Sequence, residues 1–377
     1  MSAKTDRVVV RGLKDVAAAE TRISFVDSMG TLYYLGYNID DLVGKVSYAE
    51  VAYLLIHERL PNQQELGEFK AALNSEMKLP DPIVESIKAT PKNCHPMDVL
   101  RTEVSHLSEY DPDSNDFSEA ANFRRATRLV AQVPAIVATL HRSRLNQPVP
   151  KPREDFGFTK NFLYMFKGTP PDEGETDVLH RFMILHADHG FNASTFAARV
   201  TASTNSDMYS AVTSAIGTLK GPLHGGASEK VMEMLDDINL EEEVEEYIDG
   251  LLGEQKKIMG FGHRVYKAED PRTKHLRGMV ENLCHRERTL GLYNKCIKIE
   301  KIVHERKKIY PNVDFYAAVA MDALGVPKEF FPLFFAASRI SGWVAHVLEQ
   351  YEDAVLLRPS SKYVGEFGRP FVPIEQR

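Results

Sequence analysis

The residues best suited to chemistry lie in the stretch KKIMGFGHRVYKAEDPR, residues 256–272. It places His263 after two glycines, Gly260 and Gly262, which let the backbone turn sharply and approach a ligand closely. An imidazole there can polarise a carbonyl, and nearby cations can hold carboxylate or phosphate oxygens. The alternative is a solvated surface loop with an incidental histidine. The cations of the stretch are Lys256, Lys257, Arg264, Lys267 and Arg272.

A second histidine, His224, lies in the glycine-rich sequence KGPLHGGASE. Gly221, Gly225 and Gly226 around it indicate close ligand approach at the start of a helix. Backbone N–H groups and the helix dipole also favour anions at such a position. This pattern therefore predicts a ligand site.

Two other polar clusters also have structural explanations. Asp314 follows Asn312 in PNVDFYAA, and the commonest role of Asp after such a turn is to cap a helix. In HADHGFNAST, His186 and His189 are three residues apart, as in a metal pair on a helix, but no third ligand has suitable spacing. We therefore expect no metal site, and we predict that His186 is a core histidine bonded to backbone.

Two histidines and a carboxylate from separate segments would make an acid–base set. The carboxylate can remove a weakly acidic C–H proton while a neutral imidazole donates to the adjacent carbonyl oxygen. A second imidazole can polarise an acceptor carbonyl. Arg272, Arg339 and Arg358 can form forked bonds to carboxylates. These residues indicate a small polycarboxylate substrate and allow a phosphate-rich partner, but they leave the reaction open.

The elements that must position these residues are helical in pattern, apart from a predicted N-terminal β-hairpin over 22–27 and 31–38. Ser47 and Glu50 have capping-box spacing at the start of a helix over 47–60, which Pro61 ends. LPDP at 79–82 is typical of a turn, and the C-terminal tail is expected to be extended. Further helices are predicted over 63–77, 96–109, 117–143, 158–167, 176–204, 206–219 and 330–350.

The composition shifts toward charge between residues 221 and 318. We therefore predict a smaller helical domain over 221–318, inserted into a large helical domain formed by 1–220 and 319–377. The acidic run at 240–247 is expected to be a solvated helix face. The predicted fold class is all-α.

Overall charge and cysteine usage narrow the class of protein. A net charge of −7 over 377 residues argues against a nucleic-acid-binding surface. The three cysteines, Cys94, Cys284 and Cys296, have no metal-like or disulfide-framework spacing, which fits a reducing compartment. With no signal-peptide pattern and no apolar run judged long enough to span a membrane, the sequence predicts a cytoplasmic protein.

Several motifs, in the same order along nearly the whole chain, resemble those of the citrate synthase family. The most specific are GPLHGGA, GFGHRVYK with DPR, PNVDFY and SRISGW. The resemblance implies a large and a small helical domain that close over acetyl-CoA and oxaloacetate. It also implies an aldol-type condensation followed by hydrolysis of the citryl thioester, with acetyl-CoA as a substrate and no cofactor or metal.

The resemblance also implies roles for individual residues. His224 matches the histidine that bonds the acetyl-CoA carbonyl, Asp314 the base, and His263 the group that polarises the oxaloacetate keto oxygen. Arg358 matches an arginine donated to the neighbouring subunit's site, which implies at least a dimer. The implied dicarboxylate-binding residues are His189, Arg272 and Arg339. The implied CoA-binding residues are Lys257, Ile258, Met259, Gly260, Phe261, Gly262 and Lys267, with the loop wrapping the adenine.

Two alternatives stay open at this point. SDMYSA, GLYN and RPFV resemble the 2-methylcitrate synthase branch, which uses propionyl-CoA, whereas GHRVYK resembles the citrate branch. One methylene in an apolar pocket is worth only about 1–3 kcal/mol, so use of both acyl-CoAs is an alternative. A non-catalytic CoA- or citrate-binding regulator is the alternative from another class.

The sequence departs from the family pattern after Asp314, where Tyr316 is followed by Ala317 and Ala318. This change affects packing behind the base.

Overall fold

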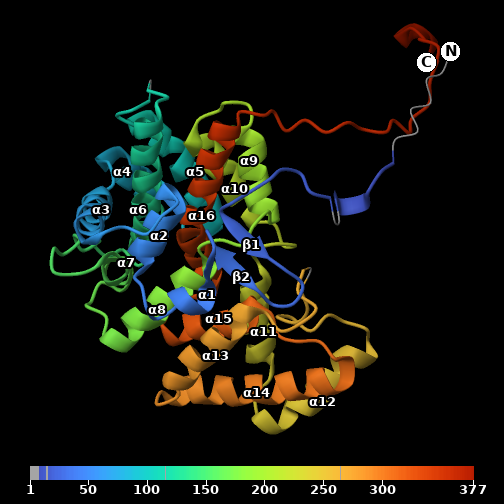
Figure 1. The fold of residues 1–377 in the computed structure, drawn as a ribbon. Coiled ribbons are helices and arrows are strands. Elements are labelled where there is room, and N and C mark those ends of the chain that lie inside the picture. The colour runs from blue at the N-terminus through green and yellow to red at the C-terminus, as the bar shows by residue number, and fades with distance from the viewer. Residues whose placement is uncertain (1–7, 14–15, 115, 264) are drawn as a thin grey trace.

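The computed structural model describes residues 8–13, 16–114, 116–263 and 265–377. Within them helices dominate, and the predicted all-α class is confirmed (Figure 1). The α-helices are α1 (Ile39–Leu42), α2 (Tyr48–His57), α3 (Gln63–Glu76), α4 (Asp81–Ala89), α5 (Pro96–Leu107), α6 (Glu119–Arg144), α7 (Phe158–Lys167), α8 (Glu173–His186), α9 (Ala193–Ala202), α10 (Met208–Leu219), α11 (Ala227–Asp237), α12 (Val244–Gly253), α13 (Pro271–Asn282), α14 (Glu287–Lys307), α15 (Val313–Ala323) and α16 (Phe331–Asp353). Short 3₁₀ turns lie at η1 (Arg11–Leu13), η2 (Ser108–Tyr110), η3 (Glu241–Glu243), η4 (Lys328–Phe330) and η5 (Ile374–Gln376).

Side-chain caps explain where several helices begin. The predicted capping box of Ser47 and Glu50 is present at α2, and α2 ends at His57 because Glu58 adopts a left-handed conformation. Helix α4 was not predicted, because its LPDP start is typical of a turn. Prolines are nevertheless tolerated in the first turn of a helix, where their missing N–H would have no partner anyway.

The N-terminal hairpin is a three-stranded antiparallel sheet in the order β1 (Ser24–Val26), β2 (Leu32–Tyr34), β3 (Tyr37–Asn38). The predicted strand over 31–38 is divided because Leu35 and Gly36 both have positive φ and make a tight turn. The prediction of a two-stranded hairpin was therefore incomplete.

Helix α16 forms the centre of the core, as expected for an apolar helix predicted over 330–350. It packs against α2, α6, α8, α9 and α10, and its Trp343 is fully buried. Contrary to the sequence interpretation, Lys328–Asp353 is long and apolar enough to cross a membrane, but 94% of its apolar window is buried inside the protein. Packing within the core accounts for this composition.

The continuous helix predicted over 176–204 is wrong, because α8 ends at His186 and α9 begins at Ala193. In the loop between them, the buried Asp188 carboxylate accepts hydrogen bonds from Ser24 Oγ at 2.5 Å and from the Gly190 N–H at 2.8 Å. Asn192 then caps α9 by accepting from the Ser194 and Thr195 N–H groups. These bonds stabilise a loop where the helical pattern of the sequence continues.

Gly342 of α16 allows this loop to lie directly against the helix. Its N–H donates to the Ala187 carbonyl at 3.1 Å, and a Cβ on Gly342 would lie 2.3 Å from the same oxygen. We expect Gly342→Ala to lower the free energy of unfolding by about 1–3 kcal/mol, because the obstructing atom is backbone. Chemical denaturation measures this change.

The matched control for Gly342 is Gly67, in the middle of α3, where an added Cβ meets nothing within 4 Å. Gly67→Ala should raise the free energy of unfolding by about 0.5–1 kcal/mol through helix propensity. Equal effects of the two substitutions would contradict the steric explanation.

Helices α11–α14 lie together at one end of the molecule, at the bottom of Figure 1. The predicted inserted domain, 221–318, covers these helices but ends inside α15, and this division stays a prediction. The acidic run at 240–247 lies in η3 and the start of α12, where Val244 is buried and all the glutamates are exposed. A solvated acidic face is confirmed there.

Candidate active site

The loop that carries His263 is shaped by its two glycines and by pairing with the segment before α15. Gly260 and Gly262 have φ of +78° and +76°. Phe261 forms an antiparallel bridge with Pro311, and the Gly262 N–H donates to the Tyr310 carbonyl at 3.0 Å. These contacts hold the loop against the start of α15.

The protonation of His263 follows from its backbone contacts. Its Nδ1 accepts from the N–H groups of Val265 and Tyr266, each at 3.0 Å. Burial, with a contribution from the Arg272 charge, lowers the pKa of His263 to about 4. The neutral ring therefore carries its proton on Nε2, which can donate to a carbonyl oxygen.

His189 lies beside His263, with 5.3 Å between ring centroids. Its Nε2 lies 2.9 Å from the Tyr266 hydroxyl, and the Tyr266 ring stacks on His263 at 4.4 Å. Burial first, and then the Arg272 charge, hold the pKa of His189 well below its usual value. Tyr266 therefore orients both imidazoles, a role that no motif in the sequence indicated.

His224 contacts α9 through Ser194, whose Oγ lies 2.8 Å from His224 Nε2. The same Oγ accepts from the indole N–H of Trp343 at 3.2 Å and donates to Asn192 Oδ1 at 2.7 Å. Burial lowers the pKa of His224 to about 4, so the ring is neutral, and with Nε2 at Ser194 its Nδ1 is the nitrogen that can face a ligand.

Asp314 does not cap α15, so the structural explanation of this residue is wrong. The cap is Asn312, whose Oδ1 accepts from the Asp314 N–H at 3.0 Å. Burial raises the pKa of the Asp314 carboxyl to about 6, opposed by the Arg272 charge and reinforced by Asp270. A carboxylate with this pKa is a stronger base than an ordinary aspartate.

Arg272 and Arg339 are both almost fully buried, in different surroundings. Arg272 makes a forked ion pair with Asp270, through Nε at 2.9 Å and a terminal nitrogen at 2.7 Å. Arg339 donates Nε–H to the His186 carbonyl at 2.6 Å, and within the described residues no carboxylate forms an ion pair with it. A buried guanidinium without an ion pair is costly and suits an anionic ligand.

The charges of these two arginines connect the separate segments into one site. Both act on the pKa values of Asp314 and His189, and Arg339 also acts on the pKa of His224. Site residues lie at or next to the N-termini of four helices, α9, α11, α13 and α15. Such N-termini favour anions, which agrees with the predicted carboxylate and phosphate ligands.

The sequence matches a known protein family over most of its length. Residues 12–360 match the family model described as the citrate synthase C-terminal domain. The chain belongs to the citrate synthase family. Citrate synthase 2 of Bacillus subtilis is 47% identical over 97% of this chain and 99% of its own length. The 2-methylcitrate synthase 1 of Corynebacterium glutamicum is 40% identical over 99% of this chain and 100% of its own length.

The fold agrees with that of solved citrate synthases. The ternary complex of carboxymethyl coenzyme A and oxaloacetate with citrate synthase from Thermoplasma acidophilum gives a TM-score of 0.93 at 32% identity. That alignment covers 98% of this chain and 100% of the other. Citrate synthase from Thermotoga maritima gives a TM-score of 0.88 at 38% identity, with 98% and 99% covered.

The other residues that the citrate synthase resemblance named lie in two places. Of the loop predicted to bind CoA, Ile258 and Gly260 are buried, Met259 and Phe261 are half-buried, and Lys257 is exposed. Lys267 is exposed on the same stretch, and its N–H donates to the Ser28 carbonyl at 3.0 Å. Arg264 lies outside the described residues.

Arg358 is not brought to this site within one chain. It is exposed on the extended segment after α16, which runs away from the helices in Figure 1. The neighbouring Leu357 N–H donates to Ser203 Oγ, at the end of α9 opposite to Asn192. At about 1.5 Å per residue, α9 separates these ends by about 15 Å.

Several buried polar residues support the site without having been singled out by their sequence. His346 of α16 contacts Asp188 at 3.3 Å, and Asp270 caps α13 while accepting from the Val313 N–H. The contacts of His346 with Asp188 and of Asp270 with Val313 join residues far apart in sequence, so no local signal indicates them. His186 is a core histidine, and its Nδ1–H donates to the Phe182 carbonyl at 2.8 Å, as predicted. Among the described residues, no cluster of His, Cys, Asp or Glu could hold a metal ion.

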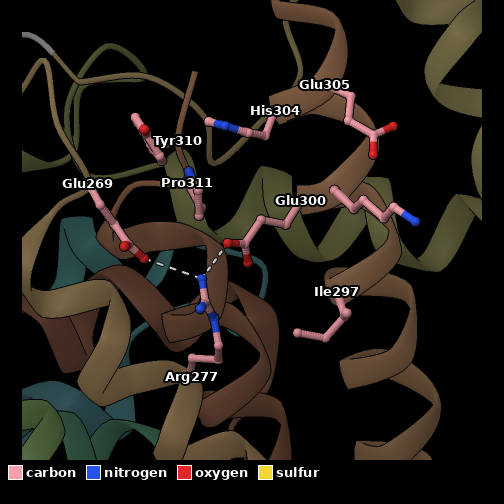
Figure 2. A pocket seen from close by; sticks show the side chains of 9 residues that line it. Glu269, Arg277, Ile297, Glu300, His304, Glu305, Tyr310 and Pro311 are labelled. Atoms are coloured by element: carbon pink, nitrogen blue, oxygen red, sulfur yellow. Dashed lines mark hydrogen bonds and ion pairs between the residues drawn. The ribbon is translucent and has the colours of Figure 1, made fainter. Parts of the chain in front are cut away.

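A separate hollow of about 410 Å³ lies between α13, α14 and the segment before α15 (Figure 2). Arg277 points between Glu269 and Glu300 there, and His304 and Tyr310 lie at another side. Of the described residues that line it, none belongs to the site predicted for a citrate synthase. It adjoins the site through Glu269, which precedes Asp270, and through Tyr310 and Pro311, which contact the loop 257–262.

Proposed function

We propose that this protein condenses acetyl-CoA with oxaloacetate and water to give citrate and CoA. The observation that carries the proposal is the presence of one carboxylate that does not cap a helix, that of Asp314, together with two neutral imidazoles. His263 Nδ1 accepts from two backbone N–H groups, so His263 presents Nε2–H. His224 Nε2 contacts Ser194 Oγ, and we propose that this hydroxyl turns its proton to Nε2 when substrate binds, so that His224 presents Nδ1–H. Membership of the citrate synthase family supports the same reaction.

In the first step, the Asp314 carboxylate removes a proton from the methyl carbon of acetyl-CoA. His224 donates its Nδ1–H to the thioester oxygen, which stabilises the enol that forms. Both groups are suited to neutral pH, because burial raises the pKa of the carboxyl and lowers that of the imidazole.

In the second step, the enol carbon attacks the keto carbon of oxaloacetate. His263 polarises the keto oxygen through Nε2–H, while His189, Arg272 and Arg339 hold the carboxylates. The new carbon–carbon bond gives citryl-CoA, and water then cleaves its thioester to release citrate and CoA. The loop 257–262 would hold the adenine through its backbone, with Lys257 and Lys267 near the CoA phosphates.

The acyl group can be tested directly, since relatives named 2-methylcitrate synthase are 40% and 39% identical. Thiol release from acetyl-CoA and from propionyl-CoA, each with oxaloacetate, gives two values of kcat/KM. A higher value for acetyl-CoA supports the proposal, and a clear propionyl preference makes the protein a 2-methylcitrate synthase. Release from neither would favour the non-catalytic regulator.

The pH dependence should report the ionisation of Asp314. The carboxylate is the active form, so activity is present above its pKa of about 6 and lost as the pH falls through that value. We expect kcat/KM for acetyl-CoA to be level above pH 7 and to fall about tenfold per pH unit below about 6. Loss of thioester absorbance measures the rate across this range, and a rate that is level down to pH 5 would contradict the assignment.

We further propose a homo-oligomer, at least a dimer, in which Arg358 enters the neighbouring site. The extended segment after α16 supports this, because Val364, Phe367 and Phe371 are each more than 80% exposed. An exposed apolar segment of this kind fits contact with a second copy.

Subunit mixing tests the shared site. Arg358→Ala and Asp314→Asn should each be inactive alone, since every site lacks one of the two groups. After unfolding and refolding together, about a quarter of wild-type activity should return, because half of the dimers are mixed and each contains one complete site. No recovery would place Arg358 in its own chain's site or outside the mechanism.

The remaining predictions concern compartment and cofactor. We propose a cytoplasmic enzyme that uses no metal or cofactor besides its substrates. The three cysteines are all free, which supports a reducing compartment.

A further inference from the structure

Asn312 forms hydrogen bonds both with the candidate CoA loop and with the candidate base. Its N–H donates to the Gly260 carbonyl at 2.8 Å, and its side-chain Nδ2 donates to the Gly262 carbonyl at 2.9 Å. Its side-chain Oδ1 accepts from the Asp314 N–H at 3.0 Å. One residue therefore bonds the loop 257–262 twice and the base once.

The two ends of the Asn312 amide have different tasks. The oxygen caps α15 and so sets where Asp314 leaves the first turn. The nitrogen fixes the Gly262 carbonyl, one residue before His263. Serine or aspartate could supply the oxygen, but among the usual N-cap residues only asparagine supplies both an acceptor and an N–H donor of this reach.

Neighbouring contacts also hold the loop 257–262 and Asp270 against the start of α15. A Cβ on Gly260 would lie 2.8 Å from the Phe315 ring, so the loop already lies directly on α15. Asp270 accepts from the Val313 N–H at 3.2 Å while it pairs with Arg272. The first turn of α15 is thus bonded to Asp270, which pairs with the proposed oxaloacetate-binding residue Arg272. Through Asn312 it is also bonded to the loop 257–262.

We propose that Asn312 is a positioning residue that couples the CoA-binding loop to the catalytic base, so that a loop held for CoA also holds Asp314 in place. This inference rests on the proposed function and assigns to Asn312 a role beyond capping. It acts through Asp314 and Gly262 and does not itself react.

Two substitutions separate the tasks. Asn312→Asp keeps an oxygen for the Asp314 N–H but replaces the donor to Gly262 with a carboxylate oxygen, which repels that carbonyl. Asn312→Ser keeps a good helix cap but is too short to reach Gly262. Both variants keep the fold of α15, and thermal unfolding checks this.

For both variants we expect KM for acetyl-CoA to rise about tenfold and kcat to fall about ten- to a hundredfold, since a misplacement near 1 Å costs about that much. The Kd of oxaloacetate should change less than about twofold, because the residues proposed to bind it are not bonded to Asn312. Oxaloacetate binding can be followed by fluorescence of Trp343, the one tryptophan in the sequence. The Kd of CoA, measured by calorimetry in the presence of oxaloacetate, should rise about tenfold, because the Gly262 carbonyl no longer accepts a hydrogen bond from residue 312.

Asn62 provides the matched control, because it caps α3 through its side-chain oxygen, which accepts from the Glu65 N–H, at an exposed position. Asn62→Asp and Asn62→Ser should leave kcat, KM and both Kd values unchanged. Wild-type kcat, KM and CoA binding in the Asn312 variants would overturn the proposal, as would an equal weakening of oxaloacetate and CoA binding. If the wild type released no thiol, the proposed function would fail. The Kd of CoA in the Asn312 variants would then be the only test of the role proposed for Asn312.

Discussion

Asp314→Asn is expected to lower kcat for thiol release from acetyl-CoA by about 10²–10⁴-fold, the range for losing a positioned general base. Asparagine has nearly the same shape, so it should leave the Asn312 cap and the start of α15 intact. It cannot accept the methyl proton, however, and enolisation then depends on water. Thiol release at saturating acetyl-CoA and oxaloacetate measures the loss.

The structure offers a control for Asp314 on the same helix. Asp322 lies near the other end of α15, where it pairs with Arg288 at 2.8 Å. Asp322→Asn removes an equal charge from the helix and should keep wild-type kcat. Oxaloacetate binding should persist in Asp314→Asn, which distinguishes removal of the base from disruption of the site. If Asp314→Asn kept more than a tenth of wild-type kcat, Asp314 would not be the base.

Local sequence motifs indicated the candidate site residues, but not the environment of their side chains. His224, His263 and Asp314 stand in glycine- or turn-rich motifs, and such motifs are local. The protonation of the two imidazoles could not be predicted, because it depends on Ser194 and on backbone N–H groups of the folded loop. The raised pKa of Asp314 likewise follows from burial that only the complete fold creates.

The errors in the fold prediction have the same physical origin. Residues 187–192 keep a helical pattern, yet the buried Asp188 makes tertiary hydrogen bonds to Ser24 and its neighbours that replace those of a helix. In 31–38 an alternating pattern concealed the turn at Leu35 and Gly36. Tertiary bonds and left-handed residues decide such positions, and hydrophobic periodicity does not record them.

His263→Ala is expected to lower kcat by about 10²–10³-fold, the loss seen when one donor to a developing oxyanion is removed. Its Nε2–H has no substitute, because His189 is directed to the Tyr266 hydroxyl. His263→Gln should recover part of the rate, since a glutamine amide nitrogen extends about as far as imidazole Nε2. The exposed His285, whose Nδ1 lies 3.3 Å from the Asn282 carbonyl, provides the control, and His285→Ala should behave as wild type. Steady-state kinetics with varied oxaloacetate measures all three variants, and a kcat for His263→Ala within about threefold of wild type would exclude His263 as the group that polarises the keto oxygen.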